Sequence, residues 1–498
     1  MQKEVDNIRA SSFIGKFKFL MKDFALYGLV GMLSRLMGIF MIPVIARVFE
    51  PAQYGVVDNI RVVYEISIAL CLLGLNSAVG VFMFQTEDPE ERKSIVSEGM
   101  ITTMVFCLFV CLILFFSADL ILGFFSIKPG AHTLEFRMMV LTIPFSCFSA
   151  LVMQLLKWNF RRIPYTIMSV GGPVILVVVT LFFILKLKLG LVGIFYGQLA
   201  SSSIIATIGF FFCKDNFIVP KRFVHLPQMM GFALPALVTN LLSNLMPAVD
   251  RRFIGQYLSS SDMGTYALGE RFSRLINIIT GALNVSWGPF SLSIYKEKDA
   301  ELVYSRIFTV YVVAMTSIGF FILSIVRPLI ILFASEKYIN SLQIIPFLLF
   351  GLIIESFAEF LGLGILISRK NYYNALSYVV HLLVSVLLMS FLIEPFGIIG
   401  LGLSFIGGRF ALVTSKHIFS IRAYNLKIPI AKQYCVVFVA ILIILLLEQY
   451  FDLTALQKGI AYGFFGIANI FVGFFVLLSK DDINSIKQKF KARKKAKG

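Results

Sequence analysis

The residues of this 498-residue sequence that could do chemistry are charged side chains set within long apolar segments. An arginine or a carboxylate at the centre of such a helix costs about 2.5–3.5 kcal/mol on insertion scales, so it usually faces a partner or a water-filled cavity. Guanidinium groups in a cavity can bind phosphate oxygens in bidentate fashion, whereas carboxylates can hold a cation or a proton. The candidates for an anionic ligand are Arg35, Arg61, Arg271, Arg274 and Arg409. The candidates for a cation or proton are Glu65, Glu270, Glu355 and Glu359.

Spacing suggests partners for some of these side chains. Glu355 and Glu359 are four residues apart, so a helix places both on one face. Because like charges at that distance repel, one is protonated or both meet a cation or an arginine. This pattern predicts an ion-coupling site, and an ion-paired contact between helices is the alternative. Arg61 and Glu65 have the same spacing and can pair with each other, and Arg409 could bond carbonyl groups of a neighbouring helix.

Several other chemistries have no support in the sequence. The loop GxxxxGKS or GxxxxGKT, which cradles nucleotide phosphates, does not occur, so we expect no ATP hydrolysis. The histidines stand apart without HExxH or similar spacing and are interpreted as structural: His132, His225, His381 and His417. The cysteines also lack metal-ligand spacing and are interpreted as packing residues: Cys71, Cys107, Cys111, Cys147, Cys213 and Cys435. We expect no cofactor, no metal site and no enzymatic activity.

The elements that must position the charged residues are apolar helices. Hydrophobic residues make up 58% of the chain and charged residues only 15%. An α-helix needs about 20 apolar residues to cross the hydrocarbon core of a membrane, and such runs recur from Phe24 almost to the end. We therefore predict an all-α integral membrane protein with about 14 transmembrane helices. They begin near Leu26, Val56, Gly99, Phe136, Tyr165, Leu189, Pro227, Met263, Ser305, Ile339, Tyr373, Gly397, Tyr434 and Gly459.

Lysine and arginine are distributed unevenly among the connectors. With an even number of helices both termini lie on one side, and roughly 30 connector Lys and Arg fall there against roughly 8 on the other side. Positive residues are retained in the cytoplasm, so both termini are predicted to be cytoplasmic. The formal charge of +17 then reflects topology and contact with anionic lipid head groups. We expect no binding of nucleic acid.

Several short motifs follow one another in an order that resembles the polysaccharide transporters and Wzx-type O-antigen flippases. That family belongs to the superfamily that also contains the multidrug and toxin extrusion transporters and the lipid II flippase. The motifs are IPVIARVFEPAQYG at 42–55, GFALP at 231–235, DRRF at 250–253, MGTY at 263–266, SWGPF at 286–290 and EPFGIIG at 394–400. One departure is Asn76 after Gly74 and Leu75, where many members of the family have an arginine.

A faint internal repeat predicts the division of the chain. Tyr54 and Gly55 precede Arg61 in the second predicted helix much as Met263 and Gly264 precede Arg271 in the eighth. This favours two pseudo-symmetric six-helix lobes of the kind found in transporters, followed by two C-terminal helices. The predicted divisions are 1–213 for the first lobe, 214–426 for the second lobe, and 427–498 for the last two helices and a basic cytoplasmic tail.

The resemblance implies transport of an undecaprenyl-diphosphate-linked oligosaccharide across the bacterial inner membrane. The cargo would be a repeat unit of O-antigen, capsule or exopolysaccharide, moved from the cytoplasmic to the outer leaflet by alternating access. The implied partners are this polyprenyl-diphosphate-linked oligosaccharide, membrane lipids, and glycan polymerase and assembly proteins. Arg35, Arg61 and Arg271 fall on predicted helices 1, 2 and 8, where the similar lipid II flippase carries cavity arginines. The resemblance thus implies that they bind the pyrophosphate.

Two alternative functions stay open at this point. A cation-coupled multidrug or toxin exporter should prefer acidic residues for cationic cargo, and the charged candidates above are of both signs. A membrane-embedded glycan polymerase or ligase belongs to another class, and we would expect it to carry a large outer loop. No connector of the predicted topology exceeds about twenty residues, which argues against an extramembrane domain.

Overall fold

The computed structural model describes residues 47–473 with short gaps. The gaps are residues 84–85, 160, 221, 282–286, 288–290, 292–294, 296–299, 369, 371, 427, 429 and 450–452. Every regular element within the described residues is a helix, which confirms the predicted all-α class. The chain divides into two compact units, residues 1–264 (unit 1) and residues 265–498 (unit 2). The predicted lobe boundaries at 213/214 and 426/427 stay predictions.

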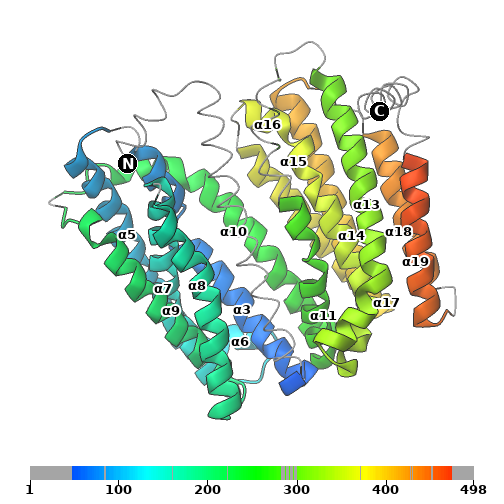
Figure 1. Cartoon of the computed structure of the whole chain (residues 1–498), viewed down its shortest axis with the longest axis horizontal. Coiled ribbons are helices and arrows are strands. Elements are labelled where there is room, and N and C mark those ends of the chain that lie inside the picture. Colours follow the sequence, from blue (N-terminus) through cyan, green and yellow to red (C-terminus); the bar gives the residue numbers. More distant parts are fainter. Residues whose placement is uncertain are drawn as a thin grey trace, which may run out of the picture. The chain divides into compact units, whose positions relative to one another are not determined.

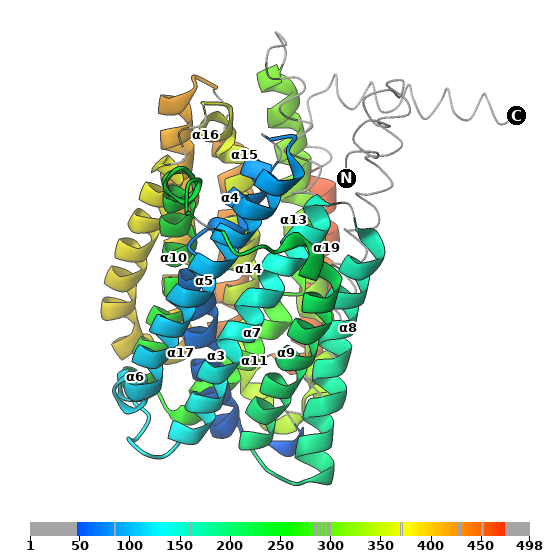
Figure 2. The same cartoon turned by 90° about the vertical axis from the view of Figure 1, so that its left-hand side faces the viewer.

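Unit 1 is a bundle of long helices with short connections. Its helices are α3 (Pro51–Cys71), α4 (Leu75–Met83), α5 (Pro89–Phe116), α6 (Ala118–Phe124), α7 (Thr133–Trp158), α8 (Arg162–Leu181), η1 (Phe182–Lys186), α9 (Val192–Cys213), η2 (Lys214–Asn216) and α10 (Leu226–Tyr257). Helices α5, α7, α8 and α9 lie side by side, as Figure 2 shows. Leu155, Met168 and Ile205 are buried in their common core. Between helices in lipid, such contacts stabilise by close packing more than by removal of water.

Local sequence signals explain where the helices of unit 1 begin. At α3 the side chain of Gln53 accepts a hydrogen bond of 3.1 Å from the main-chain N–H of Glu50. At α5 the carboxylate of Asp88 accepts one of 3.1 Å from the N–H of Glu90. A cap of this kind contributes about 1 kcal/mol by satisfying an N–H group that has no partner within the helix. Proline follows the cap in both helices, at the position where its missing N–H costs nothing.

A tight turn divides the second predicted transmembrane segment. Helix α3 ends at Cys71 and α4 begins at Leu75, with Leu73 at φ 51° and Gly74 at φ 72°. A Cβ at Gly74 would lie 2.8 Å from the carbonyl oxygen of Ala233 in α10. Glycine is needed here both for the left-handed backbone and for the close approach of two helices.

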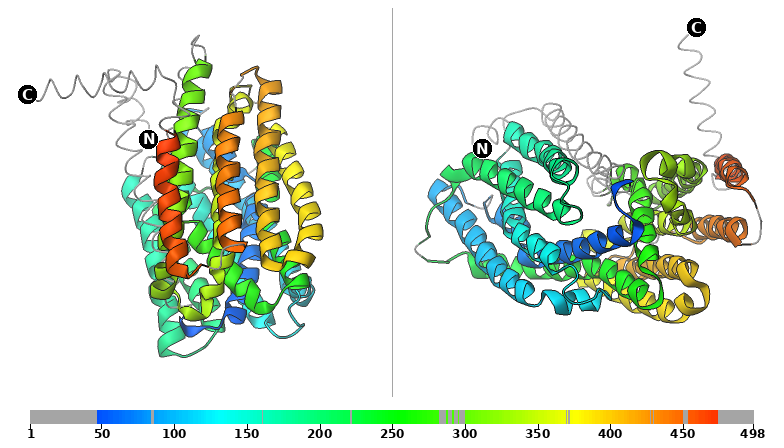
Figure 3. Two further views of the ribbon diagram at one scale, coloured as in Figure 1. Left: turned by 90° about the vertical axis from the view of Figure 1, so that its right-hand side faces the viewer. Right: turned by 90° about the horizontal axis from the view of Figure 1, so that it is seen from below.

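Unit 2 contains further helices whose bounds the structure describes. They are the rest of α11 (Ser260–Ser273), α13 (Ala300–Phe333), η3 (Glu336–Gln343), α14 (Ile345–Ser356), α15 (Ala358–Leu361), α16 (Leu363–Ser368), α17 (Tyr372–Ala423), α18 (Ala431–Gln449) and α19 (Ala455–Val472). Helices α13 and α19 lie side by side (Figures 1 and 3). The amide nitrogen of Asn469 in α19 lies 2.7 Å from the Thr316 hydroxyl and 2.8 Å from the Ser317 hydroxyl of α13. This polar contact joins two otherwise apolar helices.

Helix α17 consists of two helices joined at a break. A straight helix of its 52 residues would be about 78 Å long, far more than one membrane crossing. Gly397 has φ 55° and ψ −132°, a conformation that interrupts the helix. A Cβ at Gly400 would meet the carbonyl group of Leu392, and one at Gly408 would meet the Ser385 hydroxyl, so the two halves run back along each other. The break lies where the sequence predicts the twelfth helix to begin.

The number of membrane-spanning helices is only partly defined. Within the described residues, seven helices are long and apolar enough to cross a membrane, or up to nine if each of two bent helix pairs is one span. These findings agree with a multi-pass membrane protein. The total of about 14 stays a prediction, because the first predicted helix and the end of the last lie outside the described residues.

Candidate functional site

Arg61 and Glu65 lie on α3 of unit 1 in a cluster with two further charged residues. The Nη2 atom of Arg61 is 3.2 Å from Asp58 Oδ1, and its Nε atom is 3.7 Å from Glu65 Oε1. Arg251 of α10 approaches the same aspartate, with its Nε and Nη2 atoms 2.9 and 2.8 Å from Oδ2. The cluster therefore contains two guanidinium groups and two carboxylates (the Asp58 cluster).

The two arginines of this cluster differ in how far their side chains are buried. The side chains of Asp58 and Arg251 are 0% exposed, whereas that of Arg61 is 30% exposed. A fully buried charge is tolerated when it is paired and hydrogen-bonded, and Arg251 also donates to the carbonyl of Pro247 at 3.2 Å. Arg251 thus holds α10 against α3, and Arg61 is the more exposed guanidinium of this cluster.

Arg409 of unit 2 contacts a carboxylate and a histidine. Its Nε atom is 3.3 Å from Glu355 Oε2, and its Nη1 atom is 2.8 Å from Nε2 of His381. The Nδ1 atom of His381 is 2.8 Å from the carbonyl oxygen of Gly408. Because a carbonyl can only accept, Nδ1 carries the proton and Nε2 accepts from the guanidinium. The ring is therefore neutral in this arrangement, and Glu355 is the carboxylate that balances Arg409.

Glu355 and Glu359 are predicted to share one face of a helix, and the structure places a single turn residue, Phe357, between the two helical segments that carry them. Their common face and their role stay predictions. Helix α14 ends at Ser356 and α15 begins at Ala358. The reason is a change of hydrogen bonding at Phe357, whose N–H bonds the carbonyl of Ile354, three residues earlier, at 3.0 Å. Glu359 is exposed, while Glu355 is half-buried.

Lys416 adds a cation next to this pair of glutamates. It lies seven residues after Arg409, hence on the same face of the helix. Its methylene chain lies beside Gly362, and its ammonium group interacts electrostatically with Glu359 and Glu355. Unit 2 therefore brings together two carboxylates and two cations from α14, α15 and α17.

The remaining candidates lie near the end of α11 or outside the described residues. The Nη2 and Nε atoms of Arg274 are 2.7 and 3.2 Å from Glu270 Oε1, one helical turn apart. Glu270 is buried, so Arg274 balances its charge. Arg271 is half-buried on the same helix. Arg35 falls in the first 46 residues, which the structure does not describe.

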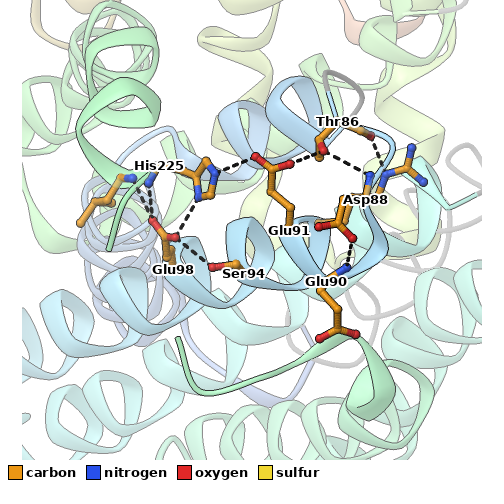
Figure 4. A network of polar contacts seen from close by, with 9 residues as sticks. Thr86, Asp88, Glu90, Glu91, Ser94, Glu98 and His225 are labelled. Atoms are coloured by element: carbon orange, nitrogen blue, oxygen red, sulfur yellow. Dashed lines mark hydrogen bonds and ion pairs between the residues drawn. The ribbon is translucent and has the colours of Figure 1, made fainter. Parts of the chain in front are cut away.

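A second polar network fixes the start of α10 to α5, and Figure 4 shows it from close by. One carboxylate oxygen of Glu98, Oε2, accepts from the main-chain N–H groups of His225 and Leu226, both at 2.9 Å. The other, Oε1, lies 3.0 Å from Nδ1 of His225 and 3.1 Å from the Ser94 hydroxyl. The Nε2 atom of His225 lies 3.1 Å from Glu91 Oε1. The fully buried Glu98 thus caps α10 from a neighbouring helix.

This arrangement favours the protonated form of His225. A carboxylate oxygen accepts, so a ring with a carboxylate at each nitrogen is fully satisfied only when both nitrogens carry protons. Partial burial opposes the charge, but the hydrogen bonds to Glu98 and Glu91 outweigh it and raise the pKa of His225 above its ordinary value. A charged His225 therefore links α5 to α10.

Three cysteines that are far apart in the sequence meet in unit 1. The Sγ atoms of Cys71, Cys107 and Cys147, from α3, α5 and α7, lie within 4.8 Å of one another, and all three residues are buried. Cys111 lies next to Cys107 with its Sγ atom 3.9 Å away. Thiols so arranged could hold a soft cation. Their packing role stays a prediction.

The chain is similar in sequence to known families and proteins. The sequence pattern of the family described as "Polysaccharide biosynthesis protein" matches residues 44–343 of the chain. The chain belongs to this family. The match covers more than half of the sequence and confirms the resemblance that the short motifs indicate. A Shigella flexneri protein assigned as an O-antigen transporter is 22% identical over an alignment of 386 residues, which covers 72% of this chain and 88% of that protein.

Solved structures show the fold of this polysaccharide biosynthesis protein. The lipid II flippase MurJ in an inward closed conformation superposes with a TM-score of 0.67, over 90% of this chain and 99% of that chain, at 16% identity. A multidrug resistance MATE family transporter in an inward-facing conformation gives a TM-score of 0.65, over 80% and 95%, at 13% identity. Both are transporters rather than enzymes, in agreement with the expected absence of catalytic chemistry.

In the polysaccharide biosynthesis protein, sequence reasoning missed four charged or polar members of the Asp58 cluster and of the cluster around Arg409 and Glu355. Asp58 stands three residues before Arg61, a spacing that could have identified it. Arg251 lies in the DRRF motif, yet its neighbour Arg252 is equally basic, and only the fold shows which of the two is buried. His381 and Lys416 depend on how the two halves of α17 meet α14 and α15, which no local spacing encodes.

Proposed function

We propose that this polysaccharide biosynthesis protein moves an undecaprenyl-diphosphate-linked oligosaccharide from the cytoplasmic to the outer leaflet of the bacterial inner membrane. The observation that carries the proposal is the family match over residues 44–343. The relative assigned as an O-antigen transporter and the fold shared with a lipid II flippase support it. A glycan polymerase and assembly proteins are the partners that such a cargo would need.

The physical requirement is a polar passage for one part of the cargo. The lipid tail can stay in the bilayer, while the pyrophosphate and the sugars need water and cationic groups. Alternating access, by movement of two lobes around a central site, provides such a passage without opening a continuous pore. Both termini are proposed to be cytoplasmic, from the excess of connector Lys and Arg on that side.

Arginines are proposed to hold the pyrophosphate. The proposed residues are Arg35, Arg61, Arg271, Arg274 and Arg409. Of these, Arg61 has a side chain that is 30% exposed, and Arg35 lies outside the described residues. Alanine at Arg35, Arg61 or Arg271 should abolish surface polysaccharide without lowering membrane abundance. Lysine should restore only part of it, because an ammonium cannot form the bidentate fork. Full complementation by all three alanine variants at normal protein levels would rule this site out.

Glutamates are proposed to couple transport to a proton or cation gradient. Glu355 and Glu359, with Glu65 and Glu270 as further candidates, are carboxylates near arginine or lysine, so protonation or a bound cation would change their pairing. The Glu355→Gln, Glu359→Gln double variant should transport without the usual dependence on ion gradients. An unchanged dependence in a correctly inserted variant would exclude these two.

The proposal is tested most simply in the host cell. Deleting the gene should abolish surface polysaccharide and accumulate lipid-linked oligosaccharide in the cytoplasmic leaflet. A polymerase or ligase would instead leave single repeat units in the outer leaflet. The MATE-like fold makes drug export the second candidate, and that function predicts drug sensitivity of the deletion strain with normal surface polysaccharide.

A further inference from the structure

One end of unit 1 contains a basic pocket that is distinct from the charged clusters described above. Its volume is about 330 Å³. It is lined by residues at four helix ends: the C-terminal ends of α4, α7 and η2 and the N-terminal end of α5. Among the described residues, its polar lining consists of three cations and two amides, with no acidic residue. These side chains are Arg92, Lys93, Arg161, Asn159 and Asn216.

Neighbouring residues orient the three cations. Arg92 donates from Nε to the carbonyl of Thr86 at 2.9 Å, and Arg161 donates from Nη1 to the carbonyl of Phe212. Carbonyl oxygens carry no net charge, so these two bonds orient the guanidinium planes without neutralising them. Lys93 pairs with Glu90 at 2.9 Å through one of its three N–H groups.

Among the acidic residues at the start of α5, Glu90 pairs with Lys93 of the pocket, and three others are held by partners outside the lining. Figure 4 shows Glu91 and Glu98 turned toward His225, and Asp88 accepting from the main-chain N–H of Glu90. Their carboxylates therefore do not line the pocket. The first turn of α5 also contributes the positive end of a 28-residue helix. The pocket thus concentrates positive charge and N–H donors at one place.

We propose that this pocket binds a phosphate group of an anionic molecule. Two guanidinium forks, an ammonium and two side-chain amides match the oxygens of a phosphate monoester, diester or diphosphate. The volume is that of a small-ligand site. The charge distribution of the sequence predicts that these connectors face the cytoplasm, where such a group belongs either to a lipid head group or to a soluble phosphate compound. This goes beyond the proposed transport activity and does not depend on it.

The test uses the full-length protein purified in detergent. The first arm counts phosphatidylglycerol bound from mixed micelles, with phosphatidylcholine as the reference lipid, by native mass spectrometry. The second arm titrates inorganic pyrophosphate calorimetrically. The variant Arg92→Gln, Arg161→Gln should weaken binding by about tenfold or more, since each lost fork removes charge-assisted hydrogen bonds. Arg222→Gln is the matched control, because Arg222 is an exposed cation in the connector before α10 and outside the pocket.

The arms also identify the source of the phosphate. Binding of phosphatidylglycerol alone assigns a lipid head group, and tight binding of pyrophosphate assigns a soluble ligand. The double variant Arg92→Lys, Arg161→Lys keeps both charges and should retain part of the binding. This result would show that the loss in the glutamine variant does not come from unfolding. Equal binding by the glutamine variant and the wild type would overturn the proposal, as would an equal loss in Arg222→Gln. These binding measurements do not depend on transport, so a failure of the proposed transport activity would leave their outcomes unchanged.

Discussion

At the scale of single residues, Arg61 and Arg251 show how two identical side chains in one cluster differ. Both approach Asp58, but only Arg251 is fully buried. A buried ion pair is a weak source of net stability, because desolvation of both charges offsets their attraction. Removing one partner is different, since it leaves the other charge buried and uncompensated. Arg251 is therefore expected to stabilise the fold, whereas the more exposed Arg61 is the ligand-binding residue that we propose in this cluster.

Arg251→Ala should lower the free energy of unfolding by about 3–5 kcal/mol, because Asp58 would lose its buried partner. Thermal unfolding of the purified protein in detergent measures this. Arg252→Ala is the matched control, since this half-buried neighbour contacts the Ser126 hydroxyl at 3.3 Å and should lose much less. Equal destabilisation by the two variants would show that the buried pair has no special role.

At the scale of elements, the start of α10 depends on a residue of another helix. Glu98 of α5 caps α10 and, together with Glu91, faces the ring of His225. The N-cap residue His225 makes no side-chain cap hydrogen bond of its own, so this cap requires that α5 and α10 stay in contact at this point. The charge on His225 strengthens that contact, which makes the junction sensitive to pH.

The junction should weaken as the pH rises. An unfolded histidine has a pKa of about 6.5, and the two carboxylates raise the folded pKa of His225. The stabilisation is therefore complete below the unfolded pKa and is lost as the pH rises through the folded pKa. Amide exchange in the first turn of α10, corrected for intrinsic rates, should accelerate from pH 6 to pH 9.

His225→Gln should remove this pH dependence, because glutamine does not titrate. His132→Gln provides the control: His132 also contacts a carboxylate, Glu135 at 3.1 Å, but lies at the start of α7. The His132→Gln variant should leave the amide exchange of α10 and its pH dependence unchanged. The same pH dependence in the wild type and in His225→Gln would mean that another group controls the junction.

The sequence predicts elements better than it predicts contacts between them. Apolar runs define helices because the period and length are local, and Gly397 marks the break in α17 as expected. The break at Phe357 was not predicted. There the main-chain N–H bonds the carbonyl three residues earlier instead of four, and no residue type in the sequence indicates this change. The meeting of Cys71, Cys107 and Cys147 also depends on how three helices pack, not on spacing.

At the scale of the whole molecule, the distribution of charge predicts orientation. The excess of connector Lys and Arg predicts that both termini lie in the cytoplasm. In a variant without native cysteines, Lys370→Cys should be labelled only from the cytoplasmic side and Asp452→Cys only from outside. Membrane-impermeant maleimide applied to intact cells and to inverted vesicles measures this. Labelling of both positions from the same side would contradict the arrangement of about 14 helices.

The central claim is that the chain transfers a lipid-linked oligosaccharide between leaflets, and translocation in proteoliposomes tests it most directly. The purified protein is reconstituted with an undecaprenyl-diphosphate-linked oligosaccharide confined to one leaflet, and a lectin that cannot cross the membrane reports its appearance on the other. We predict rapid appearance with the wild type, strong reduction with Arg61→Ala, and none in protein-free vesicles. Equal rates in wild-type and protein-free vesicles, with ion gradients imposed in both directions, would contradict the claim.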